Sequence, residues 1–339
     1  MLSDRRQKVL AALIEEYVAR ALPVGSRTIA ERYKLGVSSA TVRNELSVLE
    51  DDGYITQPYT SSGRIPTDYG YRSFVDDLLD SGLAPQDEAY DAILKELEEN
   101  ADEIETLLDK TSSALTRFTD CLSIVIAPSV LKLQIKQLSL VSLSPHRALV
   151  VLITEDGQVF NRQMEFADEV STEELSRVQT FLNEVFSGKS LHDLENGLGR
   201  SMDKAMHDPL MRLVLDKVLS CIQESEAGRA HRLGMSTLLK KPEFKQSQSL
   251  LPIIKVLEDD TILLQILDDA VENEDEDKPM VRIGSENASE ELSGVSVIAS
   301  KYGDGDNEGV VAVVGPTRMD YSKVINAVHL ASRALDDMK

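Results

Sequence analysis

Residues Val24–Tyr71 read VGSRTIAERYKLGVSSATVRNELSVLEDDGYITQPYTSSGRIPTDYGY, and a helix in the middle of this stretch decides the fold of the N-terminal part of the chain. Ser38 is a good N-cap, because its hydroxyl can accept a hydrogen bond from a free backbone amide of the first turn. Behind it, Val42, Leu46 and Leu49 recur at positions i, i+4 and i+7 and line one inward face. The opposite face of this helix is therefore expected to be exposed.

That exposed face carries Ala40, Arg43, Asn44 and Ser47. These residue types suit the edges of DNA bases: Arg binds guanine and Asn binds adenine through two hydrogen bonds each, and a small Ala fits against a thymine methyl group. The pattern predicts a recognition helix that enters the major groove of DNA.

The residues before this helix complete a helix-turn-helix. Ser26 is expected to cap a short helix over Arg27–Tyr33 that buries Ile29 and Tyr33. Lys34–Val37, which includes Gly36, is expected to form the turn into the recognition helix.

The residues after it predict a wing, a hairpin with a glycine-containing tip. Gly53 ends the helix, Tyr54–Gln57 reads as a strand, Pro58–Gly63 as a polar tip, and the chain returns through Arg64–Pro66. Arg64 is expected to reach a phosphate or a narrow minor groove. The alternative is a winged helix used for protein contacts, with its arginines merely solvated. The coincidence of a polar helix face with a basic wing favours DNA.

Composition bounds the rest of the chain. Its 339 residues predict two or three domains, and a hydrophobic content of 42% is sufficient for real cores. The net charge of −22 is unevenly spread, because residues 1–72 carry 10 Lys and Arg against 9 Asp and Glu, or +1, and the remainder −23. DNA is therefore expected to approach only from the N-terminal side.

Two cysteines bear on the cellular compartment. Cys121 and Cys221 lie 100 residues apart without a CxxC pattern, so we expect reduced core thiols in a cytoplasmic protein. The N-terminus, MLSDRRQKVL, is charged where a signal peptide is apolar, and no run approaches 18 apolar residues. We therefore expect a soluble protein that is not exported and has no membrane partner.

The sequence also lacks the usual motifs of enzymes and metal sites. None of GxSxG, GxxxxGK[ST] and HExxH occurs, so no catalytic residue and no cofactor are expected. The five histidines share no common spacing, which argues against zinc. The acidic run Asp268–Asp277 (DDAVENEDED) is interpreted as a solvated loop, because it has neither a turn glycine nor the ligand spacing of a metal site.

The flanks of the predicted reading module are helical. An opening helix is expected over Asp4–Arg20, a connecting helix over Tyr69–Leu79, a linker at Ser81–Gln86 and a long charged helix over Asp87–Phe118. In the long helix, apolar or small residues alternate by four and three, namely Tyr90, Leu94, Leu97, Ala101, Ile104, Leu108, Thr111 and Leu115. This spacing fits a coiled-coil-like seam and equally a long amphipathic helix laid on the sheet of its own domain.

From Cys121 onward the apolar period changes to two. Strands are expected over Leu122–Ala127, Gln134–Leu143, Arg147–Thr154, Gln158–Phe166, Met280–Ile283, Val295–Tyr302 and Val310–Val314. A helical block over Glu173–Gly228 separates the two groups of strands, and a closing helix runs over Tyr321–Met338. This order predicts one α+β sheet domain interrupted by an insertion.

The chain as a whole resembles the heat-inducible transcription repressor family, HrcA. The resemblance rests on PVGSRTIAERYKLGVSSATVRNELSVLEDDGYITQPYTSSGRIPTDYGYRSFVD at 23–76, LLKKPEF at 238–244, VRIGSEN at 281–287 and GPTRMDYSKVI at 315–325. The first and last stretches are specific, since a generic winged helix would share only the Thr41-Val42-Arg43 core. The segment before LLKKPEF, AHRLGMSTLL, and the acidic run depart from the family pattern.

The resemblance implies an α+β architecture of three parts. These are a winged helix-turn-helix DNA-binding domain at 1–80, a GAF-like α/β sheet domain at 87–166 and 230–339, and a mainly helical dimerising insertion at 167–229. It also implies a repressor of chaperone operons that binds an inverted-repeat operator in double-stranded DNA as a homodimer, and whose activity is maintained by the chaperonin GroEL. The candidate DNA-binding residues are Arg27, Thr28, Ser38, Ser39, Ala40, Thr41, Arg43, Asn44, Ser47 and Arg64.

Two alternatives remain open at this point. A metabolite-responsive winged-helix regulator would have the same reading module, with a small molecule bound in the GAF-like domain. The segment Gly315–Tyr321 (GPTRMDY) ends a strand and opens the last helix, so an anion site that uses Arg318 is conceivable there. The structural interpretation, in which Gly315 and Pro316 make the turn and Asp320 caps the helix, is favoured.

Overall fold

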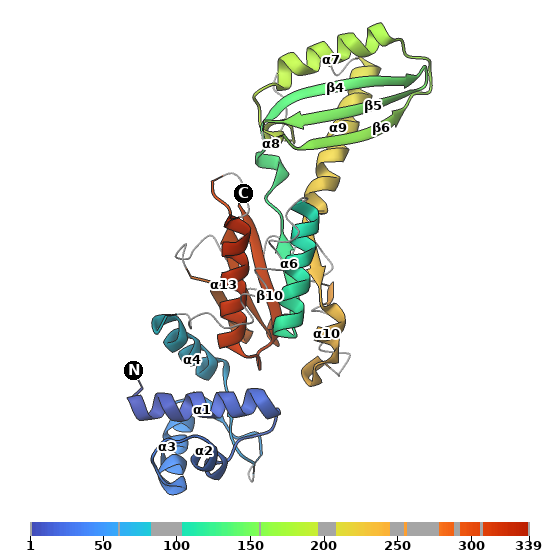
Figure 1. The fold of residues 1–339 in the computed structure, drawn as a ribbon. Coiled ribbons are helices and arrows are strands. Elements are labelled where there is room, and N and C mark those ends of the chain that lie inside the picture. Colours follow the sequence, from blue (N-terminus) through green and yellow to red (C-terminus); the bar gives the residue numbers. More distant parts are fainter. Residues whose placement is uncertain are drawn as a thin grey trace. The chain divides into compact units, whose positions relative to one another are not determined.

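The computed structural model describes residues 2–59, 62–82, 104–155, 157–195, 208–244, 254–255, 278–287, 292–305 and 308–337. It is a mixed α+β chain that divides into two compact units, and many of its elements are labelled in Figure 1. Unit 1 consists of Met1–Ile126, His231–Tyr302 and Val310–Lys339, and unit 2 of Ala127–Ala230 and Gly303–Gly309.

Unit 1 begins with three helices and a short hairpin. The helices are α1 (Asp4–Arg20), α2 (Ser26–Arg32) and α3 (Ser39–Asp51), and β1 (Ile55–Thr56) pairs antiparallel with β2 (Ile65–Pro66). Their common core consists of side chains that are at most 2% exposed: Val9, Leu10, Leu13, Ile14, Ile29, Val42, Leu46, Leu49 and Ile55. The expected bounds of the opening helix and the inward face of the third helix are confirmed.

At the ends of these helices, the structure has the cap residues expected from the sequence, except at α2. The Ser38 hydroxyl accepts a hydrogen bond from the Thr41 amide at 3.2 Å, which confirms the N-cap of α3. Gly53, with φ of +83°, follows the C-cap of the same helix in the left-handed conformation that glycine adopts most readily. Ser26, expected as a cap, is instead the first residue of α2, because the extended backbone of Gly25 takes the cap position. Tyr33, expected to be buried within this helix, is its half-buried C-cap residue.

The connecting helix α4 (Asp68–Asp80) is anchored to the β1–β2 hairpin. The Thr67 hydroxyl accepts a hydrogen bond from the Gly70 amide at 3.1 Å and donates one to the Gly53 carbonyl oxygen at 2.7 Å. A Cβ atom at Gly70 would lie 2.0 Å from the carbonyl oxygen of Tyr54, so this close approach requires glycine. The start of α4 therefore contacts the backbone at the end of α3 directly.

The rest of unit 1 is a five-stranded sheet covered by two helices. The strand order is β7 (Ala230–Leu233), β3 (Leu122–Ile126), β10 (Gly309–Pro316), β9 (Val295–Tyr302) and β8 (Met280–Ile283). Helix α6 (Ile104–Thr119) packs on β3 and α13 (Tyr321–Asp337) on β9, and the two helices contact each other. They therefore lie side by side on one face of the sheet (Figure 1).

Helix α6 shows which alternative holds for the described part of the long helix. Leu108, Thr111 and Leu115 of the proposed seam are at most 2% exposed, and α6 contacts β3 and α13 of its own unit. This part is an amphipathic helix laid on its own sheet. The seam over residues 87–103 and most of the expected linker lie outside the described residues.

One strand and one helix of unit 1 were not expected. Strand β7 lies beside β3 at the sheet edge and is followed by α10 (Met235–Lys240) and the 3-10 turn η3 (Pro242–Phe244). The residues of β7, AHRL, show no alternation of buried and exposed side chains, which is the signal that marks the other strands. They lie within the AHRLGMSTLL segment that departs from the family pattern.

Unit 2 combines an antiparallel three-stranded sheet with helices. Strands β4 (Ile135–Ser144), β5 (Arg147–Thr154) and β6 (Val159–Glu165) are neighbours in that order. The turn η1 (Val130–Lys132) precedes them, and α7 (Thr172–Phe186), α8 (Leu191–Glu195) and α9 (Pro209–Ala227) follow. Side chains of α7 and α9 share one hydrophobic cluster with the buried face of the sheet, which includes Leu138, Val150 and Met164.

Unit 2 corrects the expected domain limits. The three strands β4–β6 do not join the sheet of unit 1, so the boundary expected between residues 166 and 167 lies near Ala127 instead. Unit 2 consequently joins the helices expected for residues 167–229, namely α7, α8 and α9, with a sheet that was expected elsewhere. Its strands were located well from their alternation, but alternation is a local signal that does not say which sheet a strand joins.

Candidate nucleic-acid interface

The exposed face of α3 gathers most of the candidate DNA-binding residues. Ser38, Ser39, Ala40, Arg43, Asn44 and Ser47 are all exposed, and Thr41 is half-buried with its hydroxyl 3.0 Å from that of Ser38. The first turn of α3 contains no acidic residue. The positive end of the helix dipole is therefore not neutralised by its own side chains, which suits the approach of a phosphate.

Ion pairing distinguishes Arg43 from the other arginines near the N-terminus. Seven of the eight arginines in residues 1–72 contact a carboxylate, as the pairs Arg5–Glu45, Arg6–Glu45, Arg20–Glu16, Arg27–Glu31, Arg32–Glu16, Arg64–Glu50 and Arg72–Glu286. Among the described residues, the Arg43 guanidinium contacts no carboxylate. The side chain of the neighbouring Asn44 forms no hydrogen bond there either. A guanidinium and a carboxamide are thus left free on one exposed face.

The β1–β2 hairpin, which was expected to be the wing, places Arg64 differently from the expectation. Its guanidinium is bound to the Glu50 carboxylate of α3, with Nη2 2.9 Å from the oxygen, and its side chain is 23% exposed. Its backbone forms two hydrogen bonds with Val24, of 2.8 and 2.9 Å. A Cβ atom at Gly63 would lie 2.5 Å from the Val24 carbonyl carbon, so this bridge requires glycine. A contact between Arg64 and DNA requires the ion pair with Glu50 to open.

The segment between β1 and β2 presents an exposed aromatic residue that sequence reasoning missed. Tyr59 is 75% exposed. The Ser62 hydroxyl holds this turn by accepting from the Tyr59 amide at 3.1 Å and by donating to the Tyr59 carbonyl oxygen at 2.8 Å. An aromatic residue in an otherwise polar tip is the signal that marks it in the sequence.

The remaining candidates lie on α2. Arg27 is exposed and paired with Glu31 at 2.7 Å, and Thr28 is half-buried. Arg27 therefore resembles Arg64 rather than Arg43, since its charge is already matched within the protein.

The conceivable anion site at Arg318 is used internally. The Arg318 guanidinium donates to the Val18 carbonyl oxygen at 2.7 Å, is paired with Glu243, and is 14% exposed. The Asp320 carboxylate accepts a hydrogen bond from the Lys323 amide at 3.1 Å, which confirms its capping role. The segment is therefore structural.

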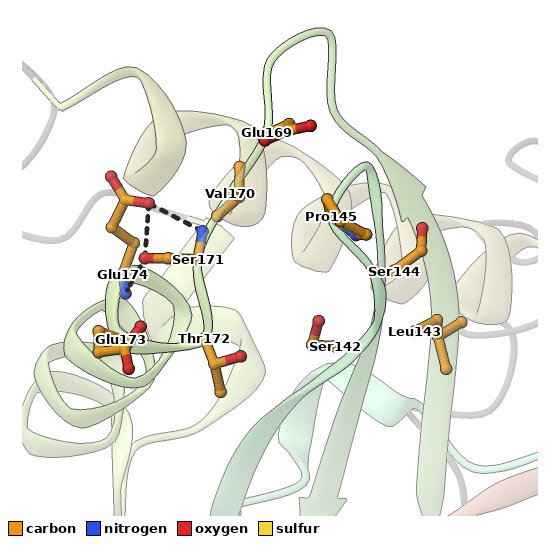
Figure 2. Close-up of a pocket in the computed structure, with 10 residues that line it drawn as sticks. All are labelled: Ser142, Leu143, Ser144, Pro145, Glu169, Val170, Ser171, Thr172, Glu173 and Glu174. Carbon is orange, nitrogen blue, oxygen red and sulfur yellow. Dashed lines mark hydrogen bonds between the residues drawn. The ribbon is translucent and has the colours of Figure 1, made fainter.

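A pocket on unit 2 lies between the β4–β5 turn and the start of α7, and Figure 2 shows the residues that line it. Ser171 and Glu174 form a capping box there: the Glu174 carboxylate accepts from the Ser171 amide at 2.9 Å, and the Ser171 hydroxyl accepts from the Glu174 amide at 3.2 Å. The Ser171 amide and hydroxyl lower the pKa of Glu174 below its usual value. The helix N-terminus is thus capped by its own carboxylate, which leaves this pocket unsuited to an acidic metabolite.

The part of the chain that the structure describes contains neither a membrane-spanning helix nor a metal-binding cluster. No helix there is long and apolar enough to span a membrane. No cluster of three or more His, Cys, Asp or Glu side chains there is arranged to hold a metal ion. Cys121 and Cys221 are both buried and free, as expected.

Known proteins resemble the chain over almost its whole length. A family profile described as the HrcA protein C terminal domain matches residues 105–325. Proteins named heat-inducible transcription repressor HrcA from Acetivibrio thermocellus and Symbiobacterium thermophilum are 34% and 36% identical to it. These alignments cover 97% of this chain and 93% of the first relative, and 100% of this chain and 99% of the second.

A solved structure shares the fold. The crystal structure of a hypothetical protein at 2.2 Å resolution aligns with 100% of both chains at a TM-score of 0.69 and 24% identity. The family profile and the full-length relatives together show that the chain belongs to the HrcA family of heat-inducible transcription repressors.

Proposed function

We propose that the chain represses heat-shock chaperone operons by binding an inverted-repeat operator in double-stranded DNA as a homodimer. In this proposal α2 and α3 form the helix-turn-helix, α3 is the recognition helix, and β1 and β2 form the wing. The observation that carries the proposal is the free pair Arg43 and Asn44 on the exposed face of α3. These are the two side chains best suited to bind guanine and adenine through two hydrogen bonds each.

A dimer is proposed because one recognition helix contacts too few base pairs to specify a single genomic site. Two-fold symmetric proteins pair with two-fold symmetric operators, and the half-sites are separated by about one helical turn, roughly 34–36 Å, or a multiple of it. Unit 2 offers a surface that supports this role. Val141 on β4 and Val159 on β6 are 47% and 56% exposed, on the sheet face opposite the one that buries Leu138 and Val150.

The remaining parts of the proposal follow from the family. The five-stranded sheet of unit 1 is assigned as the GAF-like domain, the insertion as the dimerising domain and the cytoplasm as the location. Release of the operator on heat stress and maintenance of activity by the chaperonin GroEL are also proposed. The metabolite-responsive alternative is not favoured, because the relatives are named for induction by heat.

Selection of bound DNA tests the proposal. Purified full-length protein is incubated with a pool of random-sequence duplexes, and the bound fraction is amplified and sequenced over several rounds. We expect an inverted repeat to emerge. Light scattering of the protein with the selected duplex should give two chains per duplex. A single unrepeated motif bound by one chain would contradict the proposal, and so would the absence of any enriched sequence.

A further inference from the structure

Two side chains of α4 with opposite charge contact one turn beside the five-stranded sheet of unit 1, here called the sheet domain. Asp68 and Arg72 are four residues apart and so lie on the same face of the helix. They do not pair with each other. Both contact η4 (Gly284–Glu286), the 3-10 turn that follows β8 more than 200 residues later in the chain.

The Asp68 contact is closely fitted. Its carboxylate accepts hydrogen bonds from the amide and the hydroxyl of Ser285, both at 3.0 Å. Gly284 has φ of +51°, and a Cβ atom there would lie 2.3 Å from the Asp68 Oδ2 atom. This glycine therefore permits both the turn conformation and the approach of the carboxylate.

Arg72 forms a second contact with the same turn. Its Nε atom donates to the Glu286 carboxylate at 2.8 Å, and Nη2 donates to the other Glu286 oxygen and to the Val281 carbonyl oxygen of β8. The Glu286 carboxylate is itself oriented by the Ile283 amide at 2.9 Å. Such a two-pronged contact between a guanidinium and a carboxylate fixes direction as well as distance.

The other end of α4 is continuous with the DNA-binding elements. Thr67 and Gly70 bind the start of α4 to the backbone of Gly53 and Tyr54, directly after α3. The orientation of α3 therefore follows that of α4. A partly exposed ion pair contributes little to stability. The Arg72–Glu286 pair, the Asp68–Ser285 hydrogen bonds and a matched glycine together are therefore better explained by a need for fixed geometry.

We propose that Asp68 and Arg72 are positioning residues, which hold α3 in a fixed orientation on the sheet domain through the turn Gly284–Glu286. The inference rests on the proposed function, because it concerns a dimer whose two recognition helices must match the spacing of two half-sites. Loss of the contact leaves each α3 able to bind one half-site. It removes the fixed geometry that lets both bind at once.

The test compares duplexes with one and two half-sites. The full-length variants Asp68→Ala, Arg72→Ala and Glu286→Ala are compared with Asp80→Ala on the same helix and Arg333→Ala, both exposed. The probes are the duplex selected with wild-type protein, the same duplex with one half-site scrambled, and the same duplex with one base pair inserted between the half-sites. Binding is followed by fluorescence anisotropy, and folding by circular dichroism.

For Asp68→Ala, Arg72→Ala and Glu286→Ala we expect at least tenfold weaker binding of the two-site duplex, unchanged binding of the one-site duplex and a smaller penalty for the inserted base pair. The double variant Arg72→Ala/Glu286→Ala should bind no more weakly than either single variant. Arg72→Lys, which keeps the charge but not the two-pronged geometry, should be intermediate and serves if the alanine variants do not fold.

Three results would overturn the inference in distinguishable ways. Wild-type affinity of the variants for the two-site duplex would show that the contact positions nothing. An equal loss on the one-site and two-site duplexes would show a merely structural role. A wild-type protein that selects no duplex at all would overturn the inference together with the proposed function.

Discussion

The Arg64 guanidinium in the wing donates two hydrogen bonds to one carboxylate oxygen of Glu50 in α3, from Nη2 at 2.9 Å and from Nε at 3.2 Å. Both side chains are partly buried, at 23% and 29% exposed. This pair links the β1–β2 hairpin to α3 and engages the only arginine among residues 54–66. Substitution of Glu50 and substitution of Arg64 should therefore have different effects on DNA binding.

Glu50→Gln should strengthen the binding of non-specific duplexes, because it releases the Arg64 charge. The logarithm of the affinity should fall more steeply with the logarithm of the salt concentration, by about one additional phosphate contact. Arg64→Ala should weaken binding and flatten the same salt slope. Anisotropy titrations at several salt concentrations measure both slopes. Equal slopes in the two variants would show that Arg64 does not reach DNA even when it is released.

Arg43→Ala and Asn44→Ala should reduce discrimination as well as affinity. Each should cost roughly 1–3 kcal/mol at its own base pair, the range for a lost two-bond contact to a base. Affinities for the selected duplex and for single-base variants of it are the measurement. Lys8→Ala, an exposed cation on α1, is the control and should leave the preference among duplexes unchanged. Equal weakening on selected and random duplexes would mean that another face of α3 reads the bases.

Some of the features behind these predictions can be predicted from the sequence, and others cannot. The exposed face of α3 follows from the spacing of Val42, Leu46 and Leu49, since helix periodicity and capping are local properties. The pairs Arg64–Glu50 and Asp68–Ser285 do not follow, because they join residues whose proximity is created by the folded chain. Arg64 was therefore expected to be free, and the role of η4 was not expected at all.

The strands show the same limit. β5 and β9 were predicted with their observed bounds from alternation and β-branched residues. Sheet membership was predicted only in part, because it depends on pairing between distant segments. β9 lies in the expected sheet with β3, β8 and β10, whereas β4–β6 were assigned to the wrong sheet. β7 was missed because a short edge strand with half-buried residues has no clear alternation.

Two buried tyrosines in unit 1 should respond oppositely to removal of the hydroxyl group. The Tyr321 hydroxyl lies 2.7 Å from the Ser296 hydroxyl and donates to the Thr317 carbonyl oxygen at 2.8 Å. The ring centroid of Tyr71 lies 5.5 Å from that of Tyr321. The Tyr71 hydroxyl has no hydrogen-bond partner among the described residues. Tyr321→Phe should reduce the free energy of unfolding by about 1 kcal/mol, and Tyr71→Phe should leave it unchanged or raise it. Urea denaturation measures both values, and a loss of equal size in both variants would show that Tyr71 has a partner in solution.

Cys121 should be protected from alkylation at neutral pH. Burial raises the pKa of its thiol to about 11, so the reactive thiolate is scarce in the folded protein. Its alkylation rate in the native state should rise about tenfold for each pH unit between pH 7 and 10, because the thiolate fraction grows by that factor below the pKa. Peptide mass spectrometry after treatment with iodoacetamide measures the rate, and the urea-unfolded protein is the control. A rate independent of pH would show that opening of the structure, rather than ionisation, limits the reaction.

Heat should abolish operator binding before it unfolds the protein. The contacts of Asp68 and Arg72 with η4 are few, polar and partly exposed, so they should loosen at lower temperature than the apolar core around Val42, Leu46 and Leu49. We expect DNA binding to disappear several degrees below the loss of helical signal and to recover when GroEL and ATP are added after cooling. Anisotropy of the selected duplex and far-UV circular dichroism, recorded through one temperature ramp, separate the two events. Arg72→Ala should lower the temperature at which binding is lost more than the temperature of global unfolding. Simultaneous loss of binding and helical signal, with no recovery on addition of GroEL, would place the response to heat outside this contact.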